Sequence, residues 1–478
     1  MGYSLTGRYF LRPLLLVTAT VLLCFAVLPH SAHGAWGQFT IRDEVDLGRK
    51  IKASIRSSFP LVDDPEIVEY VQGVMDRLMA AVPPQPFDFS ISVVRHNAIN
   101  AFATPGGNLF LFTGLILAMD HESEMAGVLA HEIAHASQRH IAGRIAQMQK
   151  MNVLSLAGVV LGALLGGDAG SAVAMGSMAA SHAAQLNYSR ADETDADHVG
   201  MGYFVNAGYP PAGMVGAFEK IRRQQWLVGS NIPSYLSTHP AVQDRIHSLG
   251  IRIQSMPTKV RNRKDDDTKF RRVQTLIRAR YSDTDQAMAV FNKQVQEKGP
   301  LQCLAYMGQG IVHSRNNRVS DAEMAFEKAL SCAPDEPLIT REAGMFQYQR
   351  GSRDKAATLL SQTLQKNSRD HMARFYQARL QAEKGNLKTA QDEYRRILVD
   401  MPDDPDVHYF YAQALGRDKQ MFRAYLHMAY SSLYTNDRRK TDQNYERAKT
   451  AAMTPQDQAE LKRFLEAFKE RQEILGGK

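Results

Sequence analysis

Cysteine is scarce in this chain of 478 residues, which has only three, at positions 24, 303 and 332. So few thiols exclude a scaffold built on disulfides, and they exclude a zinc finger with four thiolate ligands. Net charge is also low, because 57 Lys and Arg side chains face 50 Asp and Glu side chains. The hydrophobic content of 44% excludes a wholly disordered or collagen-like chain. At about 150 residues per domain, the length predicts roughly three structural units.

The small excess of positive charge lies in the second half of the chain. Residues 1–260 carry 19 basic and 20 acidic side chains, whereas residues 261–478 carry 38 and 30. A mildly basic half favours an acidic partner or an anionic membrane surface. The charge is too dilute for a nucleic-acid binding surface, so we expect no nucleic-acid partner.

The first segment is typical of a secretory signal peptide. Two arginines precede an apolar run over residues 14–28, and small residues follow at 31–35. The run is shorter than the about 20 residues of a membrane-spanning helix, so we predict a signal peptide over residues 1–34 that is removed. A retained membrane anchor is the alternative. Lipidation of Cys24 is disfavoured because the residue before it, Leu23, is large.

Residues 35–264 alternate helical and strand-like patterns, which predicts an α+β domain that is mostly helical with a small sheet. Helices are expected over 41–58, 65–82 and 120–150, and strands over 87–94 and 108–112. The second strand consists of Asn108, Leu109, Phe110, Leu111 and Phe112. It would offer a free sheet edge to which an extended substrate adds as a further strand. An ordinary internal strand is the alternative.

The last part of the chain repeats with a period of 34 residues. Alanine recurs with this spacing at Ala322, Ala356, Ala390 and Ala424. Large apolar residues follow in the same register, which is typical of tetratricopeptide repeats, so residues 301–478 are predicted to form an all-α solenoid. Residues 265–300 would be a linker, which begins with a charged stretch, and a degenerate capping repeat. Such an array usually binds peptides or partner proteins on its concave face.

Cys303 and Cys332 are the only cysteines that remain after signal-peptide removal. They lie near the start of one predicted repeat helix and near the end of its antiparallel partner. Those ends are neighbours in a helical hairpin, and disulfides persist outside the cytoplasm, so we predict a disulfide here. Its loop of about 30 residues would contribute about 3–4 kcal/mol. Two free thiols are the alternative.

The segment His131-Glu132-Ile133-Ala134-His135 places two histidines four residues apart. On a helix, residues i and i+4 lie on one face, so both imidazoles can bind one Zn²⁺. Glu132 lies on the adjoining edge, where it can take a proton from the attacking water. A surface helix with two unrelated histidines is the alternative. The pattern predicts a site for one zinc ion per chain.

A third zinc ligand must come from elsewhere, because catalytic zinc takes three protein ligands and keeps one open position. The best source is the acidic segment 189–197, where Glu193 and Asp197 are four residues apart on a predicted helix. One carboxylate can then bind the metal while the other orients a ligating histidine. A solvated acidic helix face is the alternative.

These two segments together resemble the M48 family of zinc metallopeptidases. Residues 100–107, 113–115 and 122–140 match the family pattern as well, so the resemblance covers most of residues 40–255. It implies a zincin-like fold for residues 35–264. It also implies roles for five residues: His131, His135 and Glu193 as zinc ligands, Glu132 as general base, and Asp197 as support for a ligand.

His239 and Arg245 lie in a segment that matches a distal element of the same family. We expect them to supply a donor, besides the metal, to the oxyanion of the reaction. His239 has a second interpretation, as an imidazole that occupies the fourth zinc position at rest, because residues 229–234 before it have loop composition. A plain helix start, with Pro240 in its first turn, is the alternative.

By the same resemblance, the chain would be a periplasmic endopeptidase of a Gram-negative bacterium that degrades misfolded or stalled outer-membrane proteins. The repeats would dock on substrates or on the barrel-assembly machinery. Two alternatives stay open. One is a chaperone or adaptor of outer-membrane protein assembly with a largely latent protease, and the other is a peptidase for soluble periplasmic proteins.

Residues 151–187 are rich in glycine and alanine, and Asp168 is their only charged residue. The apolar runs within this segment are too short for membrane spans. We expect an amphiphilic flap over the zinc cleft that can touch substrate or make peripheral contact with a membrane. A buried helix is the alternative.

Overall fold

The computed structural model describes residues 39–147, 188–228 and 234–474. The predicted signal peptide and the predicted flap over 151–187 lie outside these residues, as do the first five residues of the loop expected over 229–234. None of the helices in the described part of the chain combines the length and the apolar content that a membrane crossing requires.

The first half of the chain is a helical domain around a small sheet, as its pattern predicts. Two long helices come first, and the second of them ends three residues earlier than predicted. The elements are α2 (Ile41–Ser58), α3 (Pro65–Met79), β1 (Ser90–Val94), β2 (Ala101–Thr104), β3 (Asn108–Phe112), α4 (Thr113–Ala118), α5 (Glu122–Ser137), α6 (His140–Gln147), α10 (Arg190–Asn206), α11 (Ala212–Val228), α12 (Ser234–Thr238), α13 (Val242–Gln254) and α14 (Thr258–Arg261).

The sheet has three strands in the order β1-β3-β2. β3 pairs in parallel with β1 and antiparallel with β2. The prediction that Asn108, Leu109, Phe110, Leu111 and Phe112 form a free edge is therefore wrong, because both sides of this strand are hydrogen-bonded. The cause is β2, a short strand not predicted from the sequence. It folds back onto β3 through a turn in which Gly106 and Gly107 have φ of 73° and 77°. The sheet edge on the side of α5 belongs to β2.

The helix predicted over 120–150 is two helices. α5 ends at Ser137, and Arg139 has a left-handed backbone with φ of 55°, which interrupts the helix before α6 begins. The break turns the chain directly after the second histidine of the zinc motif. At the other end, the Glu124 carboxylate accepts hydrogen bonds from the backbone N–H of Asp120 and His121.

The charged segment predicted as a linker also reaches the start of α5. Asp267 accepts a hydrogen bond from the backbone N–H of Glu122 at 2.8 Å, and Asp265 accepts from the N–H and hydroxyl of Ser123. Carboxylates at a helix N-terminus satisfy its free N–H groups and interact favourably with the helix dipole. This segment therefore anchors the start of the motif helix.

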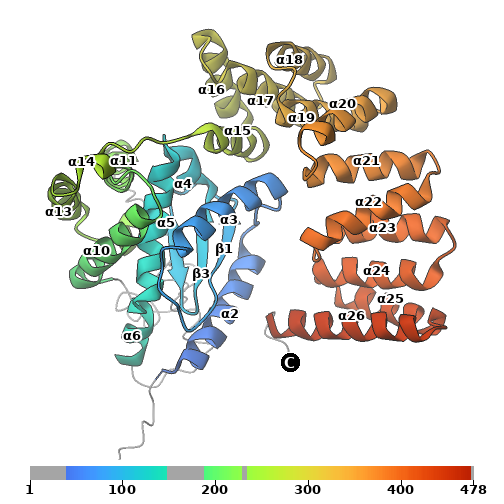
Figure 1. The fold of residues 1–478 in the computed structure, drawn as a ribbon, viewed down its shortest axis with the longest axis horizontal. Coiled ribbons are helices and arrows are strands. Elements are labelled where there is room, and N and C mark those ends of the chain that lie inside the picture. The colour runs from blue at the N-terminus through green and yellow to red at the C-terminus, as the bar shows by residue number, and fades with distance from the viewer. Residues whose placement is uncertain (1–38, 148–187, 229–233, 475–478) are drawn as a thin grey trace, which may run out of the picture.

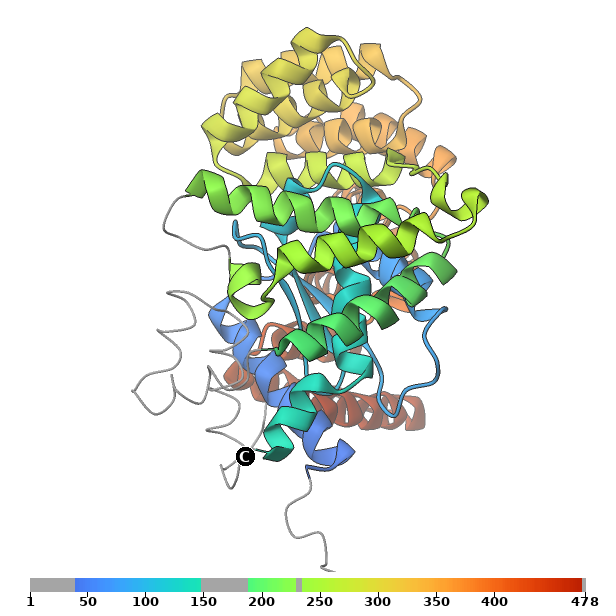
Figure 2. The ribbon, with the colours of Figure 1, turned by 90° about the vertical axis from the view of Figure 1, so that its left-hand side faces the viewer.

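α5 is buried along nearly its whole length between the sheet and the helices α10 and α11. Glycines allow the close approach: a Cβ on Gly200 would lie 2.9 Å from the backbone oxygen of Ala130, and one on Gly127 would lie 2.7 Å from the Cα of Met214. Figure 2 shows the green helices of this part packed in front of α5. The core of the domain thus forms around the helix that carries the zinc motif.

The second half of the chain is a stack of helix pairs. Figure 1 shows the pairs descending from α16 at the top to α26 at the bottom, beside the first domain. The elements are α15 (Thr268–Tyr281), α16 (Thr284–Glu297), α17 (Gln302–Arg315), α18 (Val319–Cys332), α19 (Pro337–Gln349), α20 (Arg353–Lys366), α21 (His371–Glu383), α22 (Leu387–Asp400), α23 (Pro405–Arg417), α24 (Met421–Tyr434), α25 (Arg438–Ala451) and α26 (Pro455–Ile474).

The periodic alanines lie where the repeat pattern requires small side chains. Ala322, Ala356, Ala390 and Ala424 are all buried, in the second helix of successive pairs. The structure joins Cys303 of α17 and Cys332 of α18 in a disulfide, with Cα atoms 5.4 Å apart. The two helices of that pair are thereby tied together at one end.

The two halves share one hydrophobic core. Phe270 and Leu276 of α15 are fully buried and belong to the same cluster as residues of α3 and α5, and Phe326 and Phe346 of the repeats join it. α15 packs on α3 and α4 on one side and on α17 on the other. α15 therefore packs into the hydrophobic core of the first domain and into that of the repeats.

Candidate metal centre

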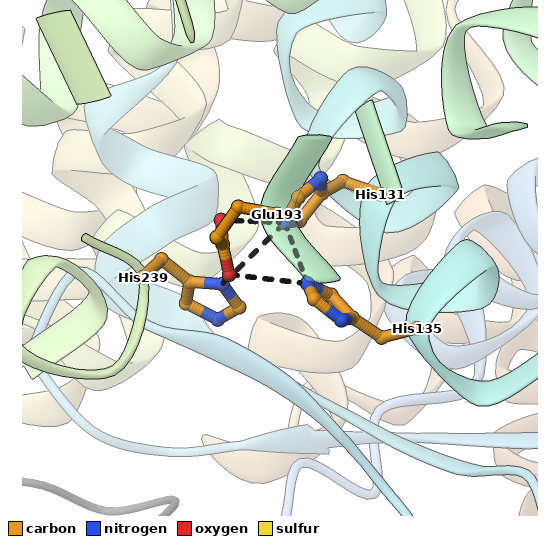
Figure 3. Close-up of side chains that lie close together, drawn as sticks. All are labelled: His131, His135, Glu193 and His239. Carbon is orange, nitrogen blue, oxygen red and sulfur yellow. Dashed lines mark hydrogen bonds and ion pairs between the residues drawn. The ribbon is translucent and has the colours of Figure 1, made fainter. Parts of the chain in front are cut away.

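Four buried side chains from three separate segments of the chain converge at one point. His131 and His135 come from α5, Glu193 comes from α10, and His239 follows α12. One ligand atom from each lies within 4.8 Å of all the others, and all four side chains are buried. Figure 3 shows the four groups pointing toward one another. Within the described residues this is the one group that could hold a metal ion.

The helical spacing explains how α5 and α10 supply their part of the cluster. The Nε2 atoms of His131 and His135 are 2.9 Å apart, as expected for residues four apart on one helix face. The Glu193 carboxylate lies 3.5 Å from His131 Nε2 and 3.3 Å from His135 Nε2. Ser189 caps α10 and accepts a hydrogen bond from the N–H of Asp192, which places Glu193 in the first turn.

The chemistry of these donors fits a zinc ion. Imidazole nitrogen and carboxylate oxygen are ordinary zinc ligands, and structural and catalytic zinc sites are built from them. Burial lowers the pKa of His135 well below its ordinary value, so the ring is neutral, which is the form that binds a metal. Without a metal ion, the imidazole nitrogens and carboxylate oxygens of these four buried groups would lack enough hydrogen-bond partners, and burying polar atoms in that state is costly.

Asp197 stands behind the cluster, as the sequence predicts for the second carboxylate of α10. Its Oδ1 lies 3.0 Å from His131 Nδ1, the nitrogen that faces away from the other ligand atoms. Arg245 donates to the same carboxylate, from Nε at 2.7 Å and from Nη2 at 2.8 Å. A carboxylate in this place sets the tautomer and orientation of a ligating imidazole.

The contacts of Arg245 differ from those expected of an oxyanion donor. Its guanidinium is paired with both Asp197 and Glu193, and it lies over the ring of Phe218 at 4.4 Å. The side chain is buried behind the carboxylates, since α13 packs against α10 and α11. Arg245 thus lies against two carboxylates of α10, at a place from which it can hold both in position.

Glu132 lies beside the cluster and is not one of the four grouped donors. The side chain is fully buried, and its carboxylate interacts with the Tyr235 hydroxyl and the backbone N–H of Ala103, which favour the ionised form. Its Oε1 is 3.5 Å from His239 Nε2. Burial raises the pKa of this carboxyl to about 7. A carboxylate that ionises near neutral pH is suited to accept and return a proton.

His239 is part of the donor set in this structure. Its Nδ1 lies 2.9 Å from Glu193 Oε1 and 3.4 Å from His131 Nε2. Its ring stacks on that of Tyr235, with centroids 4.2 Å apart. With His239 included, the cluster offers four protein donors, whereas a catalytic zinc site keeps one position open.

Three residues near the cluster were not predicted from the sequence. Tyr188 stacks on the His135 ring with centroids 3.7 Å apart, and Tyr235 stacks on His239. His140 has its Nδ1 2.9 Å from His135 Nδ1 and pairs with Asp195. Of the three, only His140 could have been suggested by the sequence, because it is a further histidine five residues after His135. The tyrosines become visible only when separate elements meet.

Sequence comparison identifies the domain around this cluster. Residues 63–253 match the family described as Peptidase family M48, and residues 342–407 match a tetratricopeptide repeat. Residues 63–253 are an M48 peptidase domain. All four clustered residues and Glu132 fall inside it. M48 metallopeptidases are generally zinc dependent.

Curated relatives are similar to this chain over 233 to 315 residues. The beta-barrel assembly-enhancing protease of Yersinia pestis is 32% identical over 233 residues, 48% of each chain. That of Escherichia coli strain K12 is 29% identical over 242 residues, 50% of each chain. A Vibrio cholerae relative is 31% identical over 315 residues, 64% of each chain. The chain thus spans about half to just under two thirds of the length of these relatives.

Proposed function

We propose that this chain is an exported zinc-dependent endopeptidase for quality control of outer-membrane proteins. The observation that carries the proposal is the convergence of His131, His135 and Glu193 beside the buried carboxylate of Glu132, within an M48 domain. The names of the relatives support the substrate class. The predicted signal peptide supports the periplasm of a Gram-negative bacterium as the location.

In this proposal, His131, His135 and Glu193 hold one Zn²⁺, which supplies Lewis acidity for peptide-bond hydrolysis. Glu132 is the general base: it accepts a proton from water and returns it to the leaving amine. Asp197 and Arg245 keep His131 and Glu193 in place through the contacts described above. Burial of all these groups excludes bulk water from the reacting centre.

The substrate would lie along β2. This strand forms the sheet edge that packs on α5, and Ala103 and Thr104 line a small cavity together with His135. An extended segment added there would be held mainly through its backbone. Such recognition suits unfolded strands of many sequences, which is what a stalled outer-membrane protein offers.

A chaperone or adaptor with a largely latent protease is the second candidate function. His239 favours it, because a fourth protein donor closes a site that catalysis requires to be open. In either case the repeats would dock on substrates or on the assembly machinery, and the tetratricopeptide-repeat match supports a protein-binding role.

Zinc content and casein cleavage of the purified mature chain, with and without a chelator, test the proposal. We expect about one zinc per chain and cleavage that a chelator abolishes. Protein that stays inert and metal-free after zinc is supplied would refute the enzyme. Glu132→Gln separates the two candidates: if it removes proteolysis and leaves outer-membrane protein assembly intact in cells, the scaffold role dominates.

A further inference from the structure

A cation on the repeats lies among aromatic rings. The guanidinium carbon of Arg379 in α21 is 4.0 Å from the centroid of Phe410, 4.8 Å from Tyr348, 5.5 Å from Tyr376 and 5.7 Å from Phe375. We call these five residues the Arg379 patch. Attraction between a cation and the faces of aromatic rings holds the guanidinium there.

Within the described residues, the contacts of the Arg379 guanidinium are with rings, and no hydrogen bond or ion pair to it is found. Ring contacts use the faces of the group and leave its five N–H donors free of any protein acceptor within the described residues. Arg353 provides the comparison. Its guanidinium also lies over Tyr348, at 4.2 Å, but it is paired with Glu383 at 2.6 Å. Arg379 therefore keeps the capacity to bind an anion that Arg353 has already used.

The patch lies across three neighbouring repeats. Its residues come from α19, α21 and α23, the first helices of successive pairs, which contact one another and are stacked in Figure 1. Arg379, Tyr376 and Phe410 are half-buried, so part of each faces solvent. Tyr409 extends the aromatic surface: it is 39% exposed and meets the Phe410 ring edge-on at 5.2 Å.

We propose that the Arg379 patch binds the C-terminal residue of an extended peptide whose last side chain is aromatic. The inference rests on the proposed recruiting role of the repeats, and it names the chemistry that they recruit. The guanidinium would donate two parallel hydrogen bonds to the terminal carboxylate. The rings of Tyr376, Tyr409 and Phe410 would pack against the terminal side chain.

The small extent of the patch selects this ligand over an acidic segment. Each of the four rings lies within 6 Å of the guanidinium carbon, so a single ligand residue that supplies both a carboxylate and a large apolar group fits the patch. A chain terminus that ends in an aromatic residue does so. An internal Asp or Glu brings a carboxylate without a ring. Glu383, which accepts a hydrogen bond from Tyr348 of the patch and pairs with Arg353, would repel a run of several acidic residues more than a single terminal carboxylate.

Fluorescence anisotropy with the full mature chain tests this directly. The probe is a labelled ten-residue peptide of Ser, Gly and Thr that ends in Phe with a free carboxylate. We expect C-terminal amidation to weaken its binding about 10-fold or more, since charge-assisted hydrogen bonds are lost. Replacing the terminal Phe with Ser should weaken binding to a similar degree. Both comparisons use the unaltered protein, so misfolding of a variant cannot mimic them.

Protein variants locate the site. Arg379→Gln should reduce affinity for the free-carboxylate peptide about 10-fold and leave the already weak binding of the amidated peptide unchanged. Arg353→Gln is the matched control and should change affinity less than twofold. Equal binding of free and amidated peptides would overturn the proposal. So would equal binding of an amidated peptide with an internal Asp-Phe pair, which would mark a general acidic-peptide surface, or loss of binding in the control alone.

Peptide binding and casein cleavage are separate readouts. Binding that depends on Arg379, in a chain that neither holds zinc nor cleaves casein after zinc is supplied, would sustain the patch and refute the enzyme. A chain that cleaves casein but binds the free-carboxylate and amidated peptides equally would sustain the enzyme and refute the patch.

Discussion

His239 is the single side chain that decides whether the metal centre is open or closed. Because its Nδ1 lies among the other donor atoms, we expect it to occupy the fourth position at rest. His239→Ala should then raise basal casein cleavage and self-cleavage of the purified chain while zinc stays bound. If His239 instead donates to the oxyanion, the change would lower the cleavage rate by about 10²–10³ with zinc retained. A rate unchanged within twofold would contradict both roles.

Asp197 is expected to act on the metal only through its neighbours. Asp197→Asn should weaken zinc affinity by about 10–100-fold, because His131 and Arg245 lose the charged group that orients them. Competition with a zinc-binding dye measures the change. Asp244→Asn is the control: this exposed residue lies one position before Arg245, and we expect it to leave zinc affinity unchanged. Equal affinities of the two variants would show that Asp197 does not support the centre.

At the scale of elements, the contact between α5 and α10 holds together the two helices that carry His131, His135 and Glu193. Gly200→Ala should lower stability by about 1–3 kcal/mol, because the new Cβ would meet the backbone of Ala130 in α5 and push the helices apart. Since α10 also carries Glu193, bound zinc should fall as well. Thermal unfolding and metal analysis measure both effects.

Gly202→Ala in the same helix is the matched control. A Cβ at Gly202 would meet nothing within 4 Å, so the change should be neutral or should stabilise α10 by up to about 1 kcal/mol. If the Gly200 and Gly202 variants melt together and bind zinc equally, close helix packing is not what positions Glu193.

At the scale of the whole molecule, a buried ion network joins the peptidase domain to the repeats. Arg341 of α19 pairs with Glu66 of α3 at 2.5 Å, with Glu342 at 2.9 Å and with Asp370 at 3.2 Å. Arg280 of α15 pairs with Glu342 and with Asp64, the residue before α3. The network therefore links three elements that the chain separates widely.

Removing Arg341 would leave these carboxylates buried and unpaired. Arg341→Gln should destabilise the junction by about 3–5 kcal/mol and make the two halves unfold in separate calorimetric steps. Arg395→Gln is the control, because its pair with Asp392 is exposed and should be worth less than about 1 kcal/mol. A single unchanged transition in the Arg341 variant would show that the shared hydrophobic core alone joins the halves.

The same network predicts acid sensitivity of the junction. Burial opposes ionisation of Glu342, but the guanidinium groups of Arg280 and Arg341 outweigh it and lower the pKa of this carboxyl below its ordinary 4.5. A lowered pKa means that the stability due to Glu342 is present above about pH 4.5 and is lost as the pH falls through the folded value. Melting temperature should therefore drop at acid pH more in the natural chain than in Glu342→Gln. Parallel pH profiles would contradict this.

Local patterns were enough to predict much of this molecule. The helix over residues 41–58 has the predicted bounds, because its start signal and apolar spacing lie within its own residues. The 34-residue period predicted the stacked helix pairs, since each repeat buries the same small positions. The spacing of His131 and His135 placed them on one helix face, and the resemblance to M48 peptidases pointed to Glu193.

The strand order, the end of the motif helix and the contacts between remote side chains could be learned only from the tertiary structure. β3 lies in the middle of the sheet because β2, which has only four residues, folds back onto it. The motif helix ends at Ser137 because Arg139 takes a left-handed backbone that no local signal marks. Arg245 faces Asp197 and Glu193 because α13 packs against α10, and Arg379 meets its rings because three repeats stack. The sequence by itself determined which side chains can do the chemistry, and packing between remote elements determined which of them meet.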